Sequence, residues 1–199
     1  MEKRTFTLNE LRAVNQANPR RLRGMAVVYD QPADVGGKWM ESIRPGALTR
    51  SLKIDRDIKA RFEHRDLLGS TSNNTLRLTD TPEGLAVEID VAETRAGDDV
   101  LSLVDRGDIR GMSFGFLPAP GGQTWAREQG KLTRSLTDID LFEVTITDSP
   151  VFTGTSVSLR SASPEAIAQA EALLADLDTD TPPTLAERRS QLRRHLAAV

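Results

Sequence analysis

Residues 111–116, with the sequence Gly-Met-Ser-Phe-Gly-Phe, constrain the fold of this chain more than any other segment. Read as a β-strand, they place Met112, Phe114 and Phe116 on one face, because successive strand side chains point to opposite sides of a sheet. The other face carries two glycines and the hydroxyl of Ser113, and glycines within a strand mark places where another backbone comes close. The segment therefore predicts a core strand in which Ser113 is either a buried structural residue or a side chain presented to an extended peptide.

Alternating segments of the same kind recur along the first 160 residues, separated by turns rich in glycine and proline. We predict strands at 4–14, 20–29, 39–43, 58–64, 75–79, 85–91, 111–116, 132–138, 141–147 and 155–160. Two helices are expected among them, at 45–52 and 96–106. The proline and glycine content of 30–37 predicts a loop. The whole pattern predicts a mainly β (α+β) fold, a closed or partly closed β-barrel with a few flanking helices.

The composition changes near the C-terminus. Ser163 begins a helical pattern whose apolar positions extend to Leu177, and after a break rich in Asp, Thr and Pro a basic helix is expected at 185–196. These two helices have too little apolar surface for a core of their own. We therefore predict a β-barrel domain at 1–160 and a helical or flexible C-terminal tail at 161–199.

The composition also limits the chemistry of the chain. It has 199 residues and no cysteine, which excludes disulfides, thiolate nucleophiles and thiolate metal sites. The net charge of −3 gives no electrostatic basis for nucleic-acid binding, and no apolar run approaches the ~20 residues that a membrane span requires. The polar N-terminus does not resemble a secretory signal, so we expect a cytosolic protein. We also expect neither a metal site nor another cofactor.

Catalysis by a serine requires a base that titrates near neutrality and a third group that orients the base. The chain has two histidines, His64 and His195, and only His64 lies in the predicted β-domain. The alternation in 58–64 places His64 on the same face as Ile58 and Ala60, at the end of an apolar strand face. A histidine in this position is either a structural residue or the base.

Glu143 is the best-placed candidate for the third group. It interrupts a strand of apolar and β-branched residues, on the face opposite the apolar side chains that pack. Three other carboxylates are weaker candidates: Asp140 and Asp148 flank the same strand, and Asp66 can pair with a nearby arginine. Spacing alone does not show that three strands converge, so a catalytic triad is a hypothesis at this level.

Sequence signatures of other chemistries are absent. The chain has neither a glycine-rich phosphate loop nor the Asp-Thr/Ser-Gly motif of an aspartic protease. The letters of 111–115 fit Gly-x-Ser-x-Gly, but in α/β-hydrolases that motif forms a turn between a strand and a helix. Here the motif lies within a strand, in a chain without regularly alternating strands and helices, which argues against a generic serine esterase.

Several blocks stand out along the chain. They are GMAVVYD at 24–30, ESIRPGAL at 41–48, FEH at 62–64, LG at 68–69, GL at 84–85, GDIRGMSFGF at 107–116 and LFEVTITDSPV at 141–151. In this order the blocks closely resemble the HK97-type prohead protease family of tailed phages. The resemblance extends over residues 20–160, and the order of the blocks makes it specific.

The resemblance implies a fold related to the herpesvirus assembly proteases, a β-barrel ringed by helices with the serine and the histidine on barrel strands. It implies that Ser113 is the nucleophile, that His64 is the general base and that Glu143 is the orienting acid. The herpesvirus relatives use a second histidine as the third member. The other histidine of this chain, His195, lies in the predicted tail, so an acidic third member is implied.

The resemblance also implies the function of a serine endopeptidase in virus capsid maturation. Such a protease cuts the scaffolding segment from the major capsid protein inside the immature shell, the prohead, and then cuts itself. Gly111 and Gly115 would then bind substrate, by leaving room for its backbone beside Ser113. The implied partners are the major capsid protein and the protease itself, with a homo-oligomer possible, in the host cytoplasm and without nucleic acid or membrane. The alternative is a non-catalytic, protease-like scaffold or capsid-assembly chaperone that binds the coat protein without cutting it.

Overall fold

The hydrophobic face of residues 111–116 lies at the centre of the core. A computed structural model describes residues 1–7, 12–13, 20–148, 156–157 and 162–179. The segment is part of strand β10 (Gly111–Pro118), in which Met112, Phe114 and Phe116 are fully buried. The two phenylalanine rings stack with their centroids 5.2 Å apart. Burying a side chain of this size stabilises a fold by roughly 1.5–3 kcal/mol. The burial of these three side chains confirms the predicted core strand.

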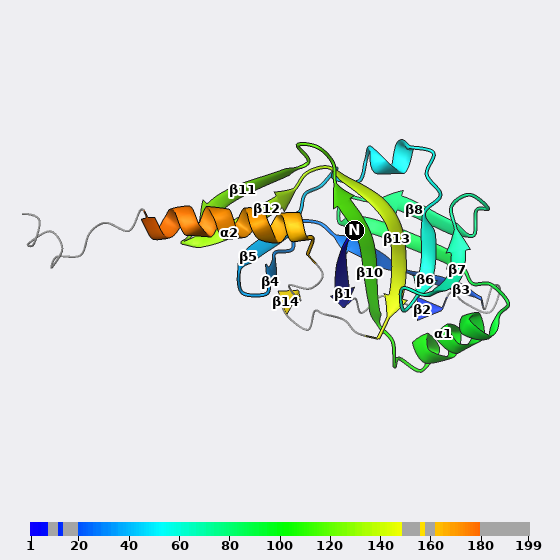
Figure 1. Cartoon of the computed structure of the whole chain (residues 1–199). Helices are drawn as coiled ribbons and strands as arrows, with labels where there is room; N and C mark the ends of the chain where they lie inside the picture. Colours follow the sequence, from blue (N-terminus) through cyan, green and yellow to red (C-terminus); the bar gives the residue numbers. More distant parts are fainter. Residues whose placement is uncertain (8–11, 14–19, 149–155, 158–161, 180–199) are drawn as a thin grey trace, which may run out of the picture. The chain divides into compact units, whose positions relative to one another are not determined.

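The strands form three sheets (Figure 1). In spatial order, the central sheet consists of β1 (Glu2–Thr7), β10, β13 (Ile139–Thr147), β6 (Lys59–Phe62) and β7 (Asp66–Ser70). The second sheet consists of β11 (Gln123–Glu128), β12 (Lys131–Leu136), β5 (Trp39–Ile43), β4 (Ala33–Val35) and β14 (Ser156–Val157). The third sheet consists of β2 (Arg12–Ala13), β3 (Arg21–Val28), β9 (Gly84–Asp90) and β8 (Leu76–Asp80). The serine strand β10 is internal in its sheet, because β1 and β13 pair with its two edges.

The mainly β class is confirmed, but the predicted barrel is wrong. Among the described residues, none of the three sheets closes on itself. The central sheet ends at β1 and β7, and closure would require these two strands to pair. Instead β1 pairs with β10 and β7 pairs with β6. Alternation in a sequence identifies strands and their apolar faces, but it does not specify which strands become neighbours.

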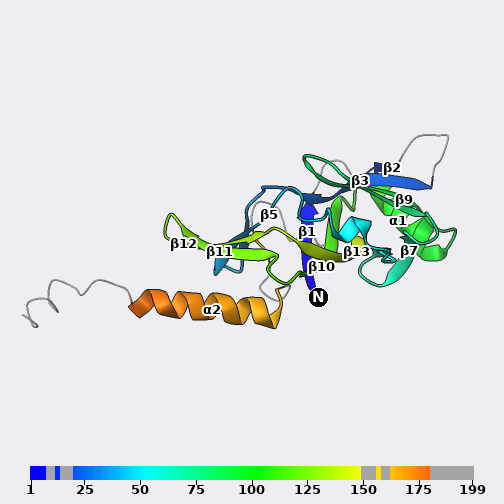
Figure 2. The same ribbon diagram turned by 90° about the horizontal axis from the view of Figure 1, so that it is seen from above.

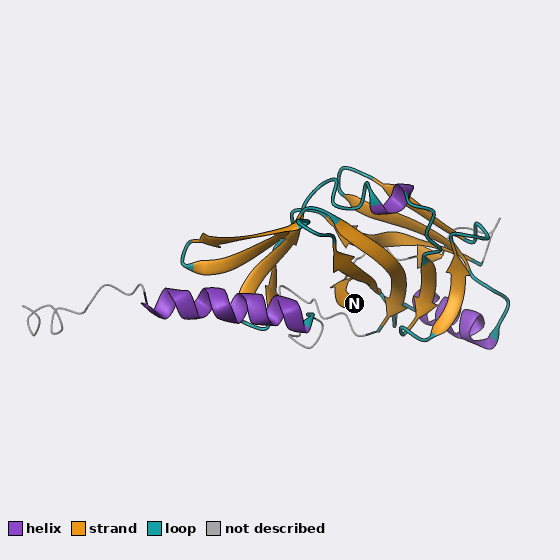
Figure 3. Ribbon diagram, turned by 45° about the horizontal axis from the view of Figure 1, so that its top comes forward, coloured by secondary structure: helices purple, strands orange, loops and turns teal. Residues whose placement is uncertain are grey.

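The core lies between the central sheet and the third sheet. Val87 and Ile89 of β9 belong to the same buried cluster as Val144 and Ile146 of β13. Strand β3 contacts both β1 and β10, which joins the two sheets directly. Figure 3 shows how strands dominate this part of the molecule. The strands predicted at 75–79 and 85–91 are confirmed as β8 and β9, which pair as an antiparallel hairpin in the third sheet.

The α-helix predicted at 96–106 is confirmed. Helix α1 (Arg95–Asp105) begins after Thr94, whose hydroxyl accepts a hydrogen bond from the Gly97 amide at 3.1 Å. This bond satisfies one of the free N–H groups of the first helical turn. Val100 and Val104 form the buried face of α1.

The helix predicted at 45–52 is wrong. Gly46 has a φ of +87°, in the left-handed region, which interrupts helical geometry after the proline. The segment instead forms consecutive turns and a short 3-10 helix, η1 (Ser51–Lys53). Proline in the first turn is therefore a weak sign of a helix when a left-handed glycine follows it.

Some strands differ from the predictions in their limits or were not expected. The segment predicted as one strand at 4–14 contains β1 and β2, with undescribed residues between them. The predicted loop at 30–37 contains β4, which is too short for a visible alternation. Strand β11 has no predicted counterpart, because most of its side chains are exposed and polar and lack an apolar face.

The chain divides into two units, Met1–Pro164 and Glu165–Val199. Helix α2 (Pro164–Thr179) confirms the helix predicted to begin at Ser163, and Figure 2 shows it as one continuous helix. The basic helix predicted at 185–196 lies outside the described residues. Within the described part of the chain, neither helix is both long and apolar enough to cross a membrane.

A buried charge cluster joins β1 to the second sheet. It consists of Glu2 and Arg4 of β1, Glu41 of β5 and Arg134 of β12, each at most 4% exposed. Arg134 Nη1 donates to Glu2 Oε2 at 2.8 Å and to Glu41 Oε2 at 2.9 Å. Arg4 Nη2 donates to the same two oxygens at 2.8 and 2.9 Å. Two positive and two negative charges are thus paired with one another, and they hold β1 in its place beside β10.

Candidate active site

The register of the central sheet brings distant segments together on the face opposite the buried phenylalanines. Ser113 of β10 is the cross-strand partner of Thr145 of β13, and Gly115 is the partner of Glu143. Thr145 is in turn the partner of Arg61 of β6. Directly opposed residues of neighbouring strands point to the same face, and in an antiparallel pair such as β10 and β13 their Cβ atoms lie about 4.5–5.5 Å apart. Ser113, Thr145 and Arg61 therefore form one row across three strands.

His64 lies just beyond the end of β6, but not on its apolar face. Glu63 and His64 both adopt left-handed backbone conformations, with φ angles of +49° and +57°. The turn directs the imidazole to the side of the sheet that carries Glu143. The prediction that His64 shares a face with Ala60 is therefore wrong, because a period of two holds only while the backbone stays extended.

The imidazole of His64 is hydrogen bonded to Glu143, with 2.7 Å between Nδ1 and Oε1. Two cations flank the same carboxylate: Arg61 Nε lies 3.1 Å from Oε2, and Lys3 Nζ lies 3.7 Å from Oε1. The hydrogen bond from His64 lowers the pKa of Glu143, as do the charges of Lys3 and Arg61, although burial acts in the opposite direction. Glu143 is therefore ionised at neutral pH and accepts the Nδ1 proton.

Thr145 supplies a second oxygen at the same ring nitrogen. Its Oγ1 lies 3.1 Å from His64 Nδ1, and Thr145 is fully buried. Because an ionised carboxylate is only an acceptor, the bond to Glu143 places the ring proton on Nδ1. The other nitrogen, Nε2, is then the basic one. The imidazole is thus held at Nδ1, and its Nε2 carries the lone pair that can accept a proton.

Ser113 is fully buried, and its hydroxyl has no hydrogen-bond partner among the described residues. A buried hydroxyl without a partner costs about 1–3 kcal/mol, which argues against a serine kept only for structure. Register, and not a direct bond to His64, relates Ser113 to the pair: Ser113 is directly opposite Thr145, whose hydroxyl contacts His64. The contact between a nucleophile and its base is often long in an enzyme without substrate.

Gly115 has a packing role that its sequence pattern does not show. A Cβ atom at this position would lie 2.8 Å from Met1 Cε and 2.9 Å from Glu143 Cγ. Glycine at this position therefore allows the side chain of Glu143 to lie across β10. Gly111 and Gly115 are both buried, and their role in binding a substrate backbone stays a prediction.

The other carboxylates considered from the sequence have different surroundings. Asp140 forms ion pairs with Arg50 and Arg56, at 2.9 and 3.3 Å. Asp66 and Asp148 are exposed at the surface. Within the described residues, Glu143 is the carboxylate that contacts the histidine.

Two cavities lie elsewhere in the molecule. One, of about 380 Å³, is lined by parts of 52–58 and 71–78, and the other, of about 410 Å³, by parts of 30–44 and 128–135. Neither is lined by Ser113 or His64. In the described ranges no three acidic or histidine side chains gather in a group that could hold a metal ion. The arrangement of side chains, and not cavity size, locates the candidate site.

Three neighbours of the His64–Glu143 pair have no role in the hypothesis drawn from the sequence. Arg61 and Thr145 alternate with core residues on their strands, so the pattern already placed Thr145 on the face of Glu143. Lys3 belongs to β1, and only the pairing of β1 with β10 brings it beside Gly115. Sequence alternation therefore contains a signal for Arg61 and Thr145 but none for Lys3.

A serine, a histidine and a carboxylate brought together by one sheet define a candidate serine hydrolase. Comparison with known protein families makes this class specific. The family model of caudovirus prohead serine proteases matches residues 7–170, and the chain belongs to this family. The resemblance to prohead proteases found in the sequence is thereby confirmed. No curated protein and no solved structure matches the chain.

Proposed function

We propose that this chain is a serine endopeptidase that cleaves the scaffolding segment of the major capsid protein inside the prohead and then cleaves itself. Membership of the prohead protease family supports the reaction class and the location. The observation that carries the proposal to individual residues is the 2.7 Å bond between His64 Nδ1 and Glu143 Oε1. Both residues are candidates from the sequence alone, and they meet on the sheet that contains Ser113.

Ser113 is the proposed nucleophile and His64 the proposed general base. As Ser113 Oγ attacks the scissile carbonyl carbon, its proton passes to Nε2 of His64. The imidazolium then returns this proton to the leaving amine as the peptide bond breaks, and water hydrolyses the acyl-enzyme by the same proton route. Backbone N–H groups supply the oxyanion stabilisation that such a reaction requires.

Glu143 is the proposed orienting acid. Its carboxylate holds the imidazole through Nδ1 and stabilises the positive charge that develops on the ring. The lowered pKa of Glu143 keeps the carboxylate ionised while His64 carries the extra proton. Arg61 binds the second oxygen of Glu143 and so fixes the direction of the first.

We propose that the substrate approaches Ser113 from the face of the central sheet. Both edges of β10 are already paired, so an extended peptide cannot add to this strand as a new neighbour. Gly111 and Gly115 keep the backbone low on either side of Ser113, which suits substrate binding once the Met1 side chain, which now packs over Gly115, moves away. Because Ser113 is fully buried, the groups that cover it must move before substrate binds. A covered nucleophile suits a protease that acts only in the assembled shell.

The proposed partners are the major capsid protein, as substrate, and a second copy of the protease, as the target of self-cleavage. The proposed location is the inside of the immature capsid in the host cytoplasm. The net charge of −3 gives no electrostatic basis for binding nucleic acid, so no nucleic-acid partner is proposed. A homo-oligomer is compatible with cleavage between copies, and measuring the mass of the purified protein in solution tests it.

Co-expression of the coat protein with the wild-type chain and with Ser113→Ala tests the proposal. Mass spectrometry of the coat protein reports both cleavage and its position. We expect cleavage with the wild type, none with Ser113→Ala or His64→Gln, and normal cleavage with Ser102→Ala, a matched control at an exposed serine on α1. Cleavage at the same position by Ser113→Ala would contradict the proposal. Intact coat protein in shells assembled with the wild type would instead favour the non-catalytic scaffold or chaperone.

A further inference from the structure

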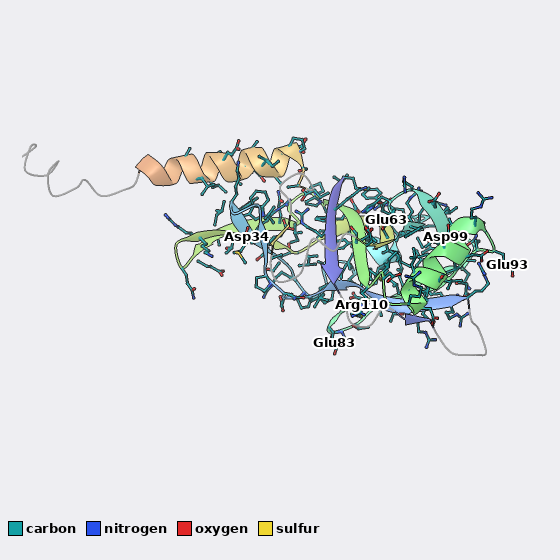
Figure 4. All side chains as sticks on the ribbon, turned by 90° about the horizontal axis from the view of Figure 1, so that it is seen from below. Asp34, Glu63, Glu83, Glu93, Asp99 and Arg110 are labelled. Atoms are coloured by element: carbon teal, nitrogen blue, oxygen red, sulfur yellow. The ribbon has the colours of Figure 1, made fainter. Side chains whose placement is uncertain are left out.

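We propose that Glu63 is a positioning residue that acts through His64. Glu63 directly precedes the histidine and lies where β6 ends beside the end of β13, and it is labelled in Figure 4. The inference rests on the proposed role of His64 as the general base. Glu63 itself does not contact the reacting atoms in this proposal, since its bonds are made to the backbone and side chains that hold the turn.

The turn that carries His64 has an unusual backbone. Glu63 and His64 are consecutive residues with positive φ, and neither is glycine. Residues other than glycine rarely adopt this backbone conformation unless surrounding contacts enforce it. Without the turn, the alternation of β6 would place His64 on the opposite face of the sheet, away from Glu143. The left-handed conformation is therefore a condition for the bond between His64 and Glu143.

The turn is closed by its own backbone bond, from the Arg65 amide to the Phe62 carbonyl at 3.0 Å, and is attached to the end of β13 through Glu63. The Glu63 amide donates to the Ile146 carbonyl at 3.0 Å. The Glu63 carboxylate accepts one bond from the Asp148 amide at 2.7 Å and another from the Thr147 hydroxyl at 3.1 Å. Glu63 thus attaches the turn to β13 through its backbone and through both of its carboxylate oxygens.

The same strand also binds the imidazole. Glu143 and Thr145 contact His64 Nδ1, and Thr147 follows them on the same face of β13. One strand therefore fixes the backbone of the turn at its end and the ring nitrogen near its middle. A change at Glu63 is transmitted to the ring, because the two attachments act on adjacent residues.

A purely structural role for Glu63 would stabilise the β6–β7 turn without affecting the imidazole. The two roles can be separated because the chain has only two histidines. In a His195→Gln background, the imidazole signals in an NMR spectrum of the full chain come from His64 alone. The Nδ1 proton bonded to Glu143 then gives a single low-field resonance, which does not depend on whether the protein cleaves anything.

We compare Glu63→Ala with Glu63→Gln in this background. The alanine variant removes both side-chain bonds, and we expect loss of the Nδ1 resonance and a fall in kcat of about tenfold to a hundredfold with little change in KM. Glutamine keeps an oxygen for the Asp148 amide and a polar atom for the Thr147 hydroxyl, so it is expected to restore most of both signals. Thr94→Ala, which removes the cap of α1, is the matched control and should leave the resonance unchanged.

Retention of the Nδ1 resonance and of kcat in a folded Glu63→Ala variant would overturn the inference. If that variant does not fold, Thr147→Val and Thr147→Ser decide, because valine removes one of the two bonds and serine keeps it. We expect a weakened resonance with valine and a normal one with serine, and equal spectra would contradict the inference. Continued cleavage by Ser113→Ala would refute the proposed function instead, whatever the spectra of the Glu63 variants.

Discussion

Each face of β1 contributes to a cluster of oppositely charged side chains, and the two clusters differ in burial and in chemistry. On one face, Glu2 and Arg4 belong to the buried charge cluster, which is almost completely shielded from solvent. On the other face, Lys3 approaches Glu143, which also binds His64. The side chains of Lys3 and His64 are 38% and 24% exposed. Neighbouring residues of one strand therefore take part in a closed structural cluster and in an open, titratable one.

The difference indicates what each cluster does. In the buried cluster, burial alone would raise the pKa of Glu41, but Arg4 and Arg134 outweigh it and the pKa is lowered. Its charges balance and none has reason to change during a reaction. The other cluster contains a histidine that accepts and releases a proton in the proposed mechanism. We therefore expect the buried cluster to control stability and the His64–Glu143 pair to control activity.

The largest expected effect is that of Glu143→Gln on cleavage. An amide cannot hold the imidazole in the required tautomer as a carboxylate does, and the corresponding change in well-studied triads lowers kcat by about 10⁴. The side chain is similar in size, so the fold should be retained. The rate of coat-protein cleavage in assembled shells measures the effect. A variant that cleaves at nearly the wild-type rate would remove Glu143 from the mechanism.

The next largest effect is that of Glu41→Gln on stability. Removing one partner of a buried ion pair leaves uncompensated charge and costs about 3–5 kcal/mol. Urea denaturation measures the loss. Glu88→Gln is the matched control, since Glu88 pairs with the half-exposed Arg23 at the surface and such pairs contribute about 0–1 kcal/mol. Equal losses for the two variants would show that the buried cluster has no special structural role.

The ionisation of Glu143 predicts a pH dependence of stability. Its pKa is lowered from the ordinary value of 4.5, so the stabilisation by its charge partners is fully present above that value. The stabilisation is lost as the pH falls through the lowered pKa, because the native carboxylate then becomes protonated. We expect the difference in unfolding free energy between the wild type and Glu143→Gln to shrink as the pH is lowered below 4.5. A difference that grows under these conditions would contradict the assignment.

The smallest expected effect is that of Lys3→Met. Its ammonium group lies 3.7 Å from Glu143 and is partly exposed, and such pairs are worth about 0.2–1 kcal/mol, which corresponds to less than about fivefold in rate. Added salt should reduce the difference from the wild type. The adjacent variant Arg4→Met should instead destabilise the fold, since Arg4 lies in the buried cluster. A large loss of activity with Lys3→Met would place Lys3 in the mechanism.

Much of the site could be predicted from local patterns. The alternation in β10 correctly identified its buried apolar side chains, and the alternation in β13 placed Glu143 away from the core. Strand pairing could not be predicted from these patterns. The described residues therefore form open sheets where a barrel was expected. The charged residues of β1 were also not expected in the interior, because Glu2 and Arg4 are buried only through partners from other strands.

The position of His64 shows where pattern analysis fails. The sequence of β6 extrapolates to the wrong face, because two left-handed residues end the alternation. They lie in a turn closed by a bond between Arg65 and Phe62 and attached to β13 by contacts that are distant in the sequence and invisible to a local pattern. The histidine was recognised as a candidate because few histidines exist in the chain and because of the family resemblance, and not because its orientation could be derived.

A serine-directed covalent probe on assembled shells tests the central claim most directly. A fluorophosphonate reacts with a serine whose hydroxyl is activated by a base, and peptide mass spectrometry identifies the modified residue. We predict labelling of Ser113 in the wild type and none in His64→Gln, although Ser113 is still present in that variant. Labelling of a different serine, or equal labelling of Ser113 with and without His64, would contradict the account.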